Sequence, residues 1–81
     1  MQKWDYSVVR TYGGVVVLVD GKEVAKMVDN QPLGEMLYEY LDGVGRDGWE
    51  VVGIAGVRDG IELILKRPLI EGEEIKEEAE A

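Results

Sequence analysis

The stretch from Leu33 to Arg67 decides the fold that this sequence predicts. It reads L-G-E-M-L-Y-E-Y-L-D-G-V-G-R-D-G-W-E-V-V-G-I-A-G-V-R-D-G-I-E-L-I-L-K-R. Apolar residues recur at helical spacing in its first part, and after Trp49 the apolar period becomes two. The stretch therefore predicts an amphipathic helix that ends at glycines, followed by two strands.

The helix is expected over residues 31–45. Pro32 suits the first helical turn, where its missing N–H removes a donor that has no partner within the helix. Either Asn30 or Gln31 could cap this end, and Gly45 suits the left-handed position that ends a helix. The apolar stripe, at i, i+4, i+7, i+8 and i+11, consists of Leu33, Leu37, Tyr40, Leu41 and Val44.

A hairpin is expected after the helix, with strands over residues 49–58 and 61–67. Asp59-Gly60 would form its turn, because a type I′ turn needs positive φ at both central residues. The glycines inside the first strand, Gly53 and Gly56, indicate a bulge or a close approach of another backbone.

The part of the chain before the helix predicts three more strands. Residues 4–10 alternate as in a half-buried strand, and Asp20-Gly21 would join Val15–Val19 to a strand over residues 22–28. The V-V-V-L-V run is apolar on both faces. Either it lies centrally in the sheet with both faces covered, or a partner chain covers one face.

These elements predict an α+β fold with an antiparallel sheet of about five strands and one helix packed on one face, in the order β-β-β-α-β-β. Residues 1–70 would form a single domain. Residues 71–81 carry six Glu and one Lys, which predicts an acidic, disordered tail. The expected core consists of Leu33, Leu37, Leu41, Val44, Val51, Ile61, Leu63 and Leu65.

The composition limits the chemistry that is available. The chain has no cysteine and no histidine, so disulfides, thiolate metal sites, thiol nucleophiles and histidine acid–base catalysis are excluded. The net charge of −8 disfavours nucleic acid as a partner. No apolar run approaches the length of a membrane span, and the N-terminal M-Q-K-W-D-Y does not resemble a secretory signal. We expect a cytoplasmic protein with no cofactor, no metal and no membrane partner.

Three motifs carry a resemblance to a known family: K-W-D-Y-S-V-V, L-D-G-V-G-R-D-G-W-E-V-V-G-I and L-I-L-K-R-P. They resemble the pattern W-E-Y-x-V-V … L-x-x-x-G-x-x-G-W-E-L-V … K-R of short prokaryotic proteins grouped as domain of unknown function 4177. The resemblance covers residues 3–10 and 33–68, and it departs from the pattern at Asp5 and Val51. It implies a compact α+β fold and brings no activity. The matching residues are Trp4, Tyr6, Gly45, Gly48, Trp49, Glu50, Lys66, Arg67 and Pro68.

The sequence favours a small non-enzymatic protein-interaction module that self-associates, most simply as a homodimer, through a sheet face or edge. Another protein is a second possible partner. The candidate interaction surface consists of Val15, Val17, Val19, Ile64, Trp4 and Tyr6.

The alternative is a small-ligand or nucleotide-binding domain that uses the Gly53–Gly56 strand and the helix exit. The candidate ligand region consists of Trp49, Glu50, Gly53 and Gly56. The motif G-V-G-R-D-G is not a dinucleotide fingerprint, because it follows a helix and precedes a strand. No catalytic residue is assigned, since Ser7 has no activating neighbour in the sequence and acidic residues in D-G loops are typical turn formers.

Overall fold

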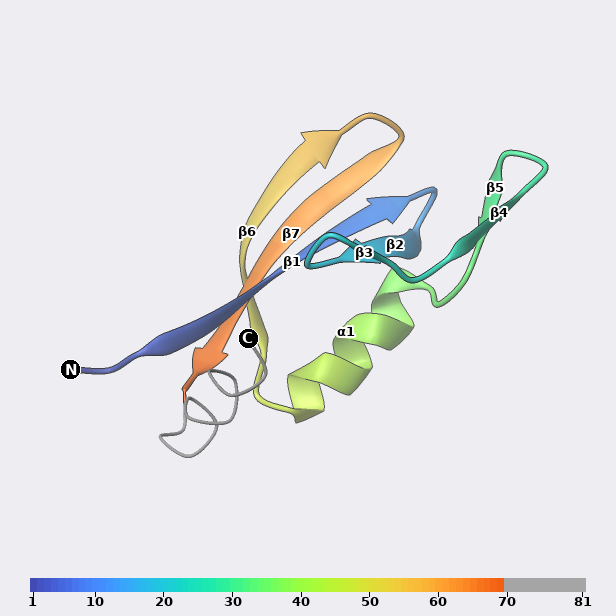
Figure 1. The fold of residues 1–81 in the computed structure, drawn as a ribbon. Helices are drawn as coiled ribbons and strands as arrows, with labels where there is room; N and C mark the ends of the chain where they lie inside the picture. The colour runs from blue at the N-terminus through green and yellow to red at the C-terminus, as the bar shows by residue number, and fades with distance from the viewer. Residues whose placement is uncertain (70–81) are drawn as a thin grey trace.

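Residues 1–69 are described by the computed structural model of this chain, and the predicted tail over residues 71–81 lies outside them (Figure 1). Within residues 1–69, five strands precede one helix in the sequence and two strands follow it. The elements are β1 (Trp4–Tyr12), β2 (Val15–Val19), β3 (Lys22–Glu23), β4 (Lys26–Val28), β5 (Gln31–Leu33), α1 (Leu37–Arg46), β6 (Glu50–Val57) and β7 (Gly60–Pro68).

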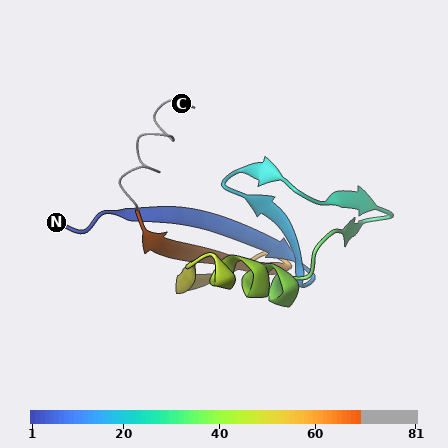
Figure 2. The same cartoon turned by 90° about the horizontal axis from the view of Figure 1, so that it is seen from below.

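Five of the strands described in residues 1–69 form one antiparallel sheet, the main sheet, in the order β3-β2-β1-β7-β6. The first and last strands, β1 and β7, are neighbours at its centre, with Val9 opposite Leu63 and Ser7 opposite Leu65. Figure 2 shows α1 along one side of this sheet. The predicted α+β class, a helix on an antiparallel sheet of about five strands, is confirmed.

A two-stranded ribbon of β4 and β5 projects from the main sheet and was not expected from the sequence (Figure 1). Its turn is Asp29-Asn30, where both residues have positive φ, 51° and 63°, as a type I′ turn requires. Asn30 therefore belongs to a turn, and Gln31 to a strand, so neither caps the helix. The single strand predicted over residues 22–28 is divided, because β3 pairs with β2 whereas β4 pairs with β5.

The helix begins at Leu37 rather than near residue 31, so this part of the prediction is wrong. The segment before it is hydrogen-bonded to the start of β2. The N–H of Val16 donates to the carbonyl of Glu35, and the N–H of Leu37 donates to the carbonyl of Gly14, both at 2.9 Å. These bonds hold the backbone extended, and the helix starts only where they end.

The helix ends at Arg46, and its exit differs by a few residues from the prediction. The left-handed residue is Gly48, with φ of 90°, and not Gly45. The N–H of Trp49 donates to the carbonyl of Val44 at 3.1 Å, which closes the last turn. The exit then directs the chain into β6.

The two predicted D-G turns have different outcomes. The turn at Asp20-Gly21 is confirmed, with φ of 52° and 83°. Between β6 and β7 the turn residues are Arg58 and Asp59, and Gly60 is already the first residue of β7. Asp59 has positive φ but Arg58 does not, so the type I′ turn predicted at Asp59-Gly60 is wrong.

The core lies where β1, β2 and β7 face α1. Its fully buried apolar residues are Val9, Val16, Leu63 and Leu65. Leu63 and Leu65 were predicted, whereas Val9 and Val16 were not assigned to the core. The predicted core residues that are half-buried and pack against this cluster are Leu37, Leu41, Val44 and Ile61.

Two predicted core residues are exposed, and their assignment to the core is wrong. Leu33 is 58% exposed because it lies in β5 of the projecting ribbon rather than on the helix. Val51 is 38% exposed because it lies on β6, the strand at one edge of the main sheet.

These positions give a stability test of the core. Leu65→Ala removes a side chain that is 1% exposed, so it should lower the free energy of unfolding by about 2–5 kcal/mol through lost transfer energy and a cavity. Leu33→Ala is the matched control and should cost less than about 1 kcal/mol. Chemical denaturation checks both values. Equal losses for the two variants would contradict this assignment of the core.

Candidate functional site

The face of the main sheet that points away from α1, here called the outer face, carries exposed apolar side chains. Strand alternation and the β1–β7 register place Trp4, Tyr6 and Val8 of β1 on this face together with Ile64 of β7, which lies opposite Val8. Their exposed fractions run from 37% for Trp4 to 58% for Tyr6. The ammonium nitrogen of Lys66 lies 4.0 Å from the centroid of the Trp4 ring, so a cation partly covers this end of the face.

A second exposed apolar region runs along β6. Among the described residues, β6 pairs with β7 on one side and forms an edge of the main sheet on the other. The large exposed apolar side chains of β6 are Val51, Val52 and Ile54, and Ile54 is 67% exposed. No charged residue lies between Glu50 and Arg58. We refer to this strand, with its unpaired side, as the β6 edge.

The opposite edge of the main sheet differs in the features that control strand pairing. There β3 consists of two residues, Lys22 and Glu23, and both are charged and exposed. Short edge strands and charged side chains are devices that prevent a sheet edge from pairing with another chain. The β6 edge is eight residues long, and its one charged residue is Glu50 at the start, with Arg58 following in the turn. Pairing with another strand is therefore favoured at β6 and not at β3.

The β6 edge contains a bulge, as the glycines in this strand suggested. The register with β7 shifts between Val51 and Gly53, so Val52 is the additional residue. A Cβ on Gly53 would lie 3.6 Å from Ile64, which is an ordinary contact, and a Cβ on Gly56 would meet nothing within 4 Å. Neither glycine is therefore required by close packing within the described chain.

The β6–β7 hairpin is fixed to β1 through Thr11, whose side chain is buried. The Thr11 hydroxyl accepts the N–H of Ile61 at 3.1 Å and donates to the carbonyl of Ile61 at 3.2 Å. The N–H of Gly13 donates to the carbonyl of Asp59 at 2.9 Å. At Gly60 the backbone of β7 lies so close to β1 that a Cβ would overlap the Thr11 carbonyl. These contacts hold the hairpin that carries the β6 edge in one position.

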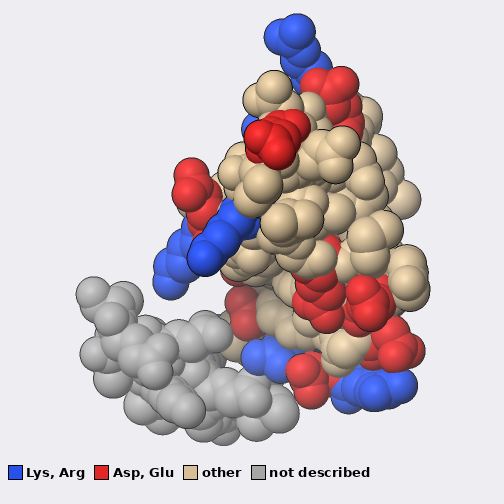
Figure 3. Space-filling view, turned by 90° about the vertical axis from the view of Figure 1, so that its right-hand side faces the viewer, with Lys and Arg blue, Asp and Glu red and all other residues tan. Residues whose placement is uncertain are grey.

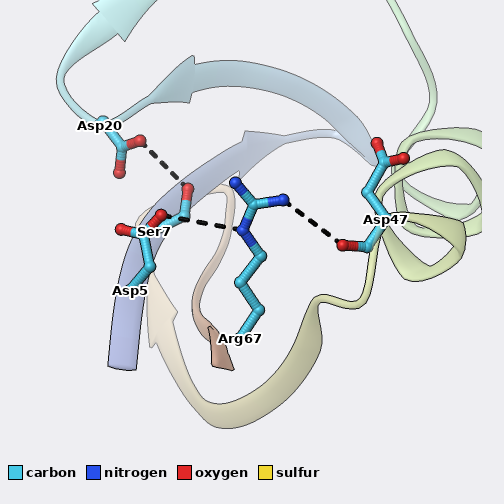
Figure 4. Close-up of polar contacts among 5 residues, drawn as sticks. All are labelled: Asp5, Ser7, Asp20, Asp47 and Arg67. Carbon is cyan, nitrogen blue, oxygen red and sulfur yellow. Dashed lines mark hydrogen bonds and ion pairs between the residues drawn. The ribbon is translucent and has the colours of Figure 1, made fainter. Parts of the chain in front are cut away.

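A group of polar residues lies on the inner, α1-facing side of the main sheet, where β1 and β7 meet the exit of α1 (Figure 4). The guanidinium Nε of Arg67 lies 3.8 Å from the Asp5 carboxylate, and an Nη donates to the Asp47 carbonyl at 3.4 Å. The same guanidinium lies 4.7 Å from the centroid of the Trp49 ring. Arg67 thus joins β1, β7 and the exit of α1, which is a structural role.

Ser7 lies in a second polar group, with Asp20 and Tyr40. The Ser7 hydroxyl donates to the Asp20 carboxylate at 3.2 Å, and the same carboxylate accepts the N–H of Val8 at 2.8 Å. Burial raises the pKa of the Tyr40 phenol above its usual value, and the nearby carboxylates of Asp20 and Glu35 raise it further. The arrangement ties the β2–β3 turn to β1, which is a structural role for Ser7 and Asp20.

A groove of about 670 Å³ lies between the main sheet and the ribbon. It is lined by Tyr12, Val17, Leu18, Glu23, Ala25, Lys26, Met27 and Val28. Met27 and Val28 of the ribbon are about half exposed. Figure 3, which views the side of the molecule that carries the ribbon, shows a broad uncharged area with acidic side chains gathered along its lower part.

The predicted interaction residues do not form one surface. Trp4, Tyr6 and Ile64 lie together on the outer face, as expected. Val15 is buried at 8% exposure, and Val19 packs against the core because it lies opposite Val9.

Val17 is the additional residue of a bulge in β2 and lines the groove. No pattern in the sequence predicts this bulge, which changes the face of the sheet on which part of the V-V-V-L-V run lies.

The predicted ligand region is dispersed as well. Trp49 is half-buried under the Arg67 guanidinium, while Glu50 begins β6 and is exposed. Gly53 and Gly56 lie along the β6 edge, and none of these four residues lines the groove. Val52 and Ile54 are exposed on β6 but were not assigned to the candidate interaction surface, and the signal for them was the absence of charge between Glu50 and Arg58.

Comparison with models of known protein families, with curated proteins and with solved structures finds no match to this chain. The resemblance to domain of unknown function 4177 stays a prediction. Within residues 1–69, no group of three or more acidic side chains is placed to hold a metal ion. No helix in the same part of the chain is long and apolar enough to cross a membrane.

The close approach at Gly60 gives a test of how the β6 edge is positioned. Gly60→Ala should lower the free energy of unfolding by about 2 kcal/mol or more, because the added methyl group meets the Thr11 carbonyl. Gly56→Ala, on the neighbouring strand, should change it by less than about 0.5 kcal/mol, because its methyl group enters open space. Thermal or chemical unfolding checks both, and an unaffected Gly60→Ala protein would contradict the anchoring described above.

Proposed function

We propose that this protein is a non-enzymatic interaction module that self-associates through its main sheet. The observation that carries the proposal is the β6 edge, an eight-residue strand with one described neighbour and no charge between its ends. Such an edge presents a row of backbone N–H and C=O groups to any strand that can align with it. The exposed apolar side chains of the outer face lie on the same sheet and add to the surface available for association.

Burial of the exposed apolar side chains of β6 against a partner strand would be more favourable than their exposure to water. Full burial of a Val or Ile side chain contributes about 1.5–3 kcal/mol, and β6 exposes three such side chains. A partner strand would cover part of that area and would replace water at the unpaired backbone groups. Burial of apolar area together with backbone hydrogen bonds is the usual basis of recognition by strand addition.

A small-ligand-binding domain remains the second candidate function, and the groove beside the ribbon favours it. Its volume of about 670 Å³ is that of an ordinary small-molecule site, and its lining is mostly apolar. In this second candidate function the ligand would lie between β2 and β4 rather than at Gly53–Gly56. The cytoplasmic location and the possibility of another protein as partner stay predictions from the sequence.

The mass in solution tests self-association. The chain has a mass of 9.0 kDa, and we expect about twice that value by light scattering at tens of micromolar protein. Ile54→Lys on the β6 edge and Val8→Lys on the outer face each place a charge on the sheet, and at least one should lower the mass to that of the monomer. Tyr38→Lys is the control, because Tyr38 is 71% exposed on α1 and should leave the mass unchanged. A wild-type protein that remains near 9 kDa would refute the proposal.

A further inference from the structure

We propose that the outer face is a second contact between copies of this chain, separate from the β6 edge. In this contact two outer faces pack against each other about a two-fold axis that runs across the strands, between the two sheets, at the level of Val8 and Ile64. The inference extends the proposed function, self-association through the main sheet, to another surface and can be tested apart from it. The charges, the apolar side chains and the shape of the outer face support it.

The β1–β7 pairing determines how side chains are arranged on the outer face. This pairing is regular over its whole length, without a bulge. Because alternate residues of a strand point to the same face, the outward side chains form rows across the two strands. Three successive rows are Arg10 opposite Glu62, Val8 opposite Ile64, and Tyr6 opposite Lys66. We refer to them as the first, middle and third rows.

The proposed axis brings unlike charges together. A rotation by 180° about the middle row exchanges the first and third rows, so Glu62 of one copy faces Lys66 of the second copy, and the symmetry repeats this pair. The two residues are four positions apart on β7, about 13 Å at 3.3 Å per residue, so they do not pair within one chain. Arg10 of one copy faces the exposed Tyr6 ring of the other. An axis at the first or third row would instead oppose like charges, which is unfavourable.

The middle of this interface would be apolar. Val8 and Ile64 are 40% and 42% exposed in the single chain, and each would meet its own copy at the axis. Gly53 of β6 lies beside Ile64 in the same row and adds no side chain. Sheets that pack face to face lie about 10 Å apart, a distance that interdigitating side chains fill. An apolar centre with charged residues around it is the usual arrangement of an interface.

The shape of the outer side is complementary to itself about the same axis. Figure 2 shows β3 and the ribbon rising from the main sheet on the side away from α1. Below the ribbon, the groove is lined by Tyr12 at the end of β1. At the other end of β1, residues 4–7 have no neighbouring strand on the β2 side within residues 1–69. The ribbon of one copy would lie in the space that β2 leaves free in the other.

The arrangement also supplies an occupant for the groove. Trp4 and Tyr12 lie four residues to either side of Val8 on β1, so the rotation brings Trp4 of one copy over Tyr12 of the other. Trp4 is 37% exposed in the single chain, and Met27 and Val28 of the ribbon line the groove. An aromatic side chain in an apolar pocket of the partner is a typical interface anchor. A two-fold axis along the strands would not fill the groove, because it would place Trp4 over the residue paired with it on β7.

Charge exchange tests this arrangement, with Ile54→Lys in every protein so that the β6 edge is blocked. The contact adds no backbone hydrogen bonds, so we expect it to be weaker than strand addition. The mass of the Ile54→Lys protein should rise from 9.0 kDa to about twice this value between tens of micromolar and about a millimolar. Adding Lys66→Glu or Glu62→Lys should each raise the dissociation constant by about tenfold, because either change creates two like-charge pairs. An equimolar mixture of the two variants should return to within about threefold of the Ile54→Lys value, because unlike pairs form between the different chains.

Glu50→Lys is the matched control for Glu62→Lys. Both glutamates lie on the outer face opposite a cation of the neighbouring strand, but the proposed axis places Glu50 over Ala55 of the second copy. The control should therefore change the dissociation constant by less than about threefold. An equal loss for the two variants, or a mixture that associates no more tightly than its components, would overturn the arrangement. None of the exchanged side chains is buried, so the fold should be retained, which circular dichroism checks.

The fluorescence of Trp4 tests whether this residue enters the groove. With Trp49→Phe added to Ile54→Lys, Trp4 is the one tryptophan left in the chain. Its emission should shift to shorter wavelength as the mass doubles, because the groove excludes water from the ring. Met27→Lys should abolish the shift. A doubling of the mass with unchanged emission would overturn the placement of Trp4.

The outcomes separate this inference from association at the β6 edge. An Ile54→Lys protein that stays monomeric up to about a millimolar would overturn the outer-face contact and leave the β6 edge, which is measured on the wild-type protein at tens of micromolar, in place. Conversely, a wild-type protein that is monomeric at tens of micromolar would refute the proposed function, and the charge mixture would still decide the outer-face contact.

Discussion

The pairing of β1 with β7 is the contact on which the rest of the structure depends. It joins the first and last strands of the described chain, and its register places Val9 and Ser7 opposite Leu63 and Leu65 at the centre of the core. Two hairpins extend from this pair in opposite directions, β2–β3 from β1 and β6 from β7. Because these contacts are remote in sequence, the chain must close a long loop before the core can form. The buried Thr11 and the close approach at Gly60 then fix the hairpin that carries β6.

This central pairing also explains why part of the sheet stays exposed. The apolar stripe of α1 covers the side of the sheet over β1, β2 and β7, and a helix of ten residues is about 15 Å long. The outer face and the far edge at β6 are left with exposed apolar side chains. The two edges of the sheet differ in kind, since β3 is short and charged whereas β6 is long and uncharged between its ends. The asymmetry supports the proposal that association is directed to one edge.

The general fold could be predicted from the sequence because local patterns determine it. The helix stripe, the period-two strands and the Asp20-Gly21 turn are each specified by a few neighbouring residues. Details that depend on remote contacts could not be predicted. The late start of α1 follows from hydrogen bonds between Glu35, Leu37 and the start of β2. The bulge at Val17 puts Val19 opposite Val9, away from the surface assigned to it. Of the residues predicted for an interaction surface, Trp4, Tyr6 and Ile64 lie together on the outer face, whereas the β6 edge required the strand order, which the sequence did not specify.

Amide hydrogen exchange along β6 tests the central claim, that the β6 edge is the surface through which this chain associates. In a monomer, alternate amides between Gly53 and Val57 face water and exchange rapidly. In the proposed dimer, the same amides bond to the second copy. The account predicts that their protection rises with protein concentration in step with the measured mass, while amides of β3 stay unchanged. A mass that doubles without any change in the exchange of the β6 amides would contradict it.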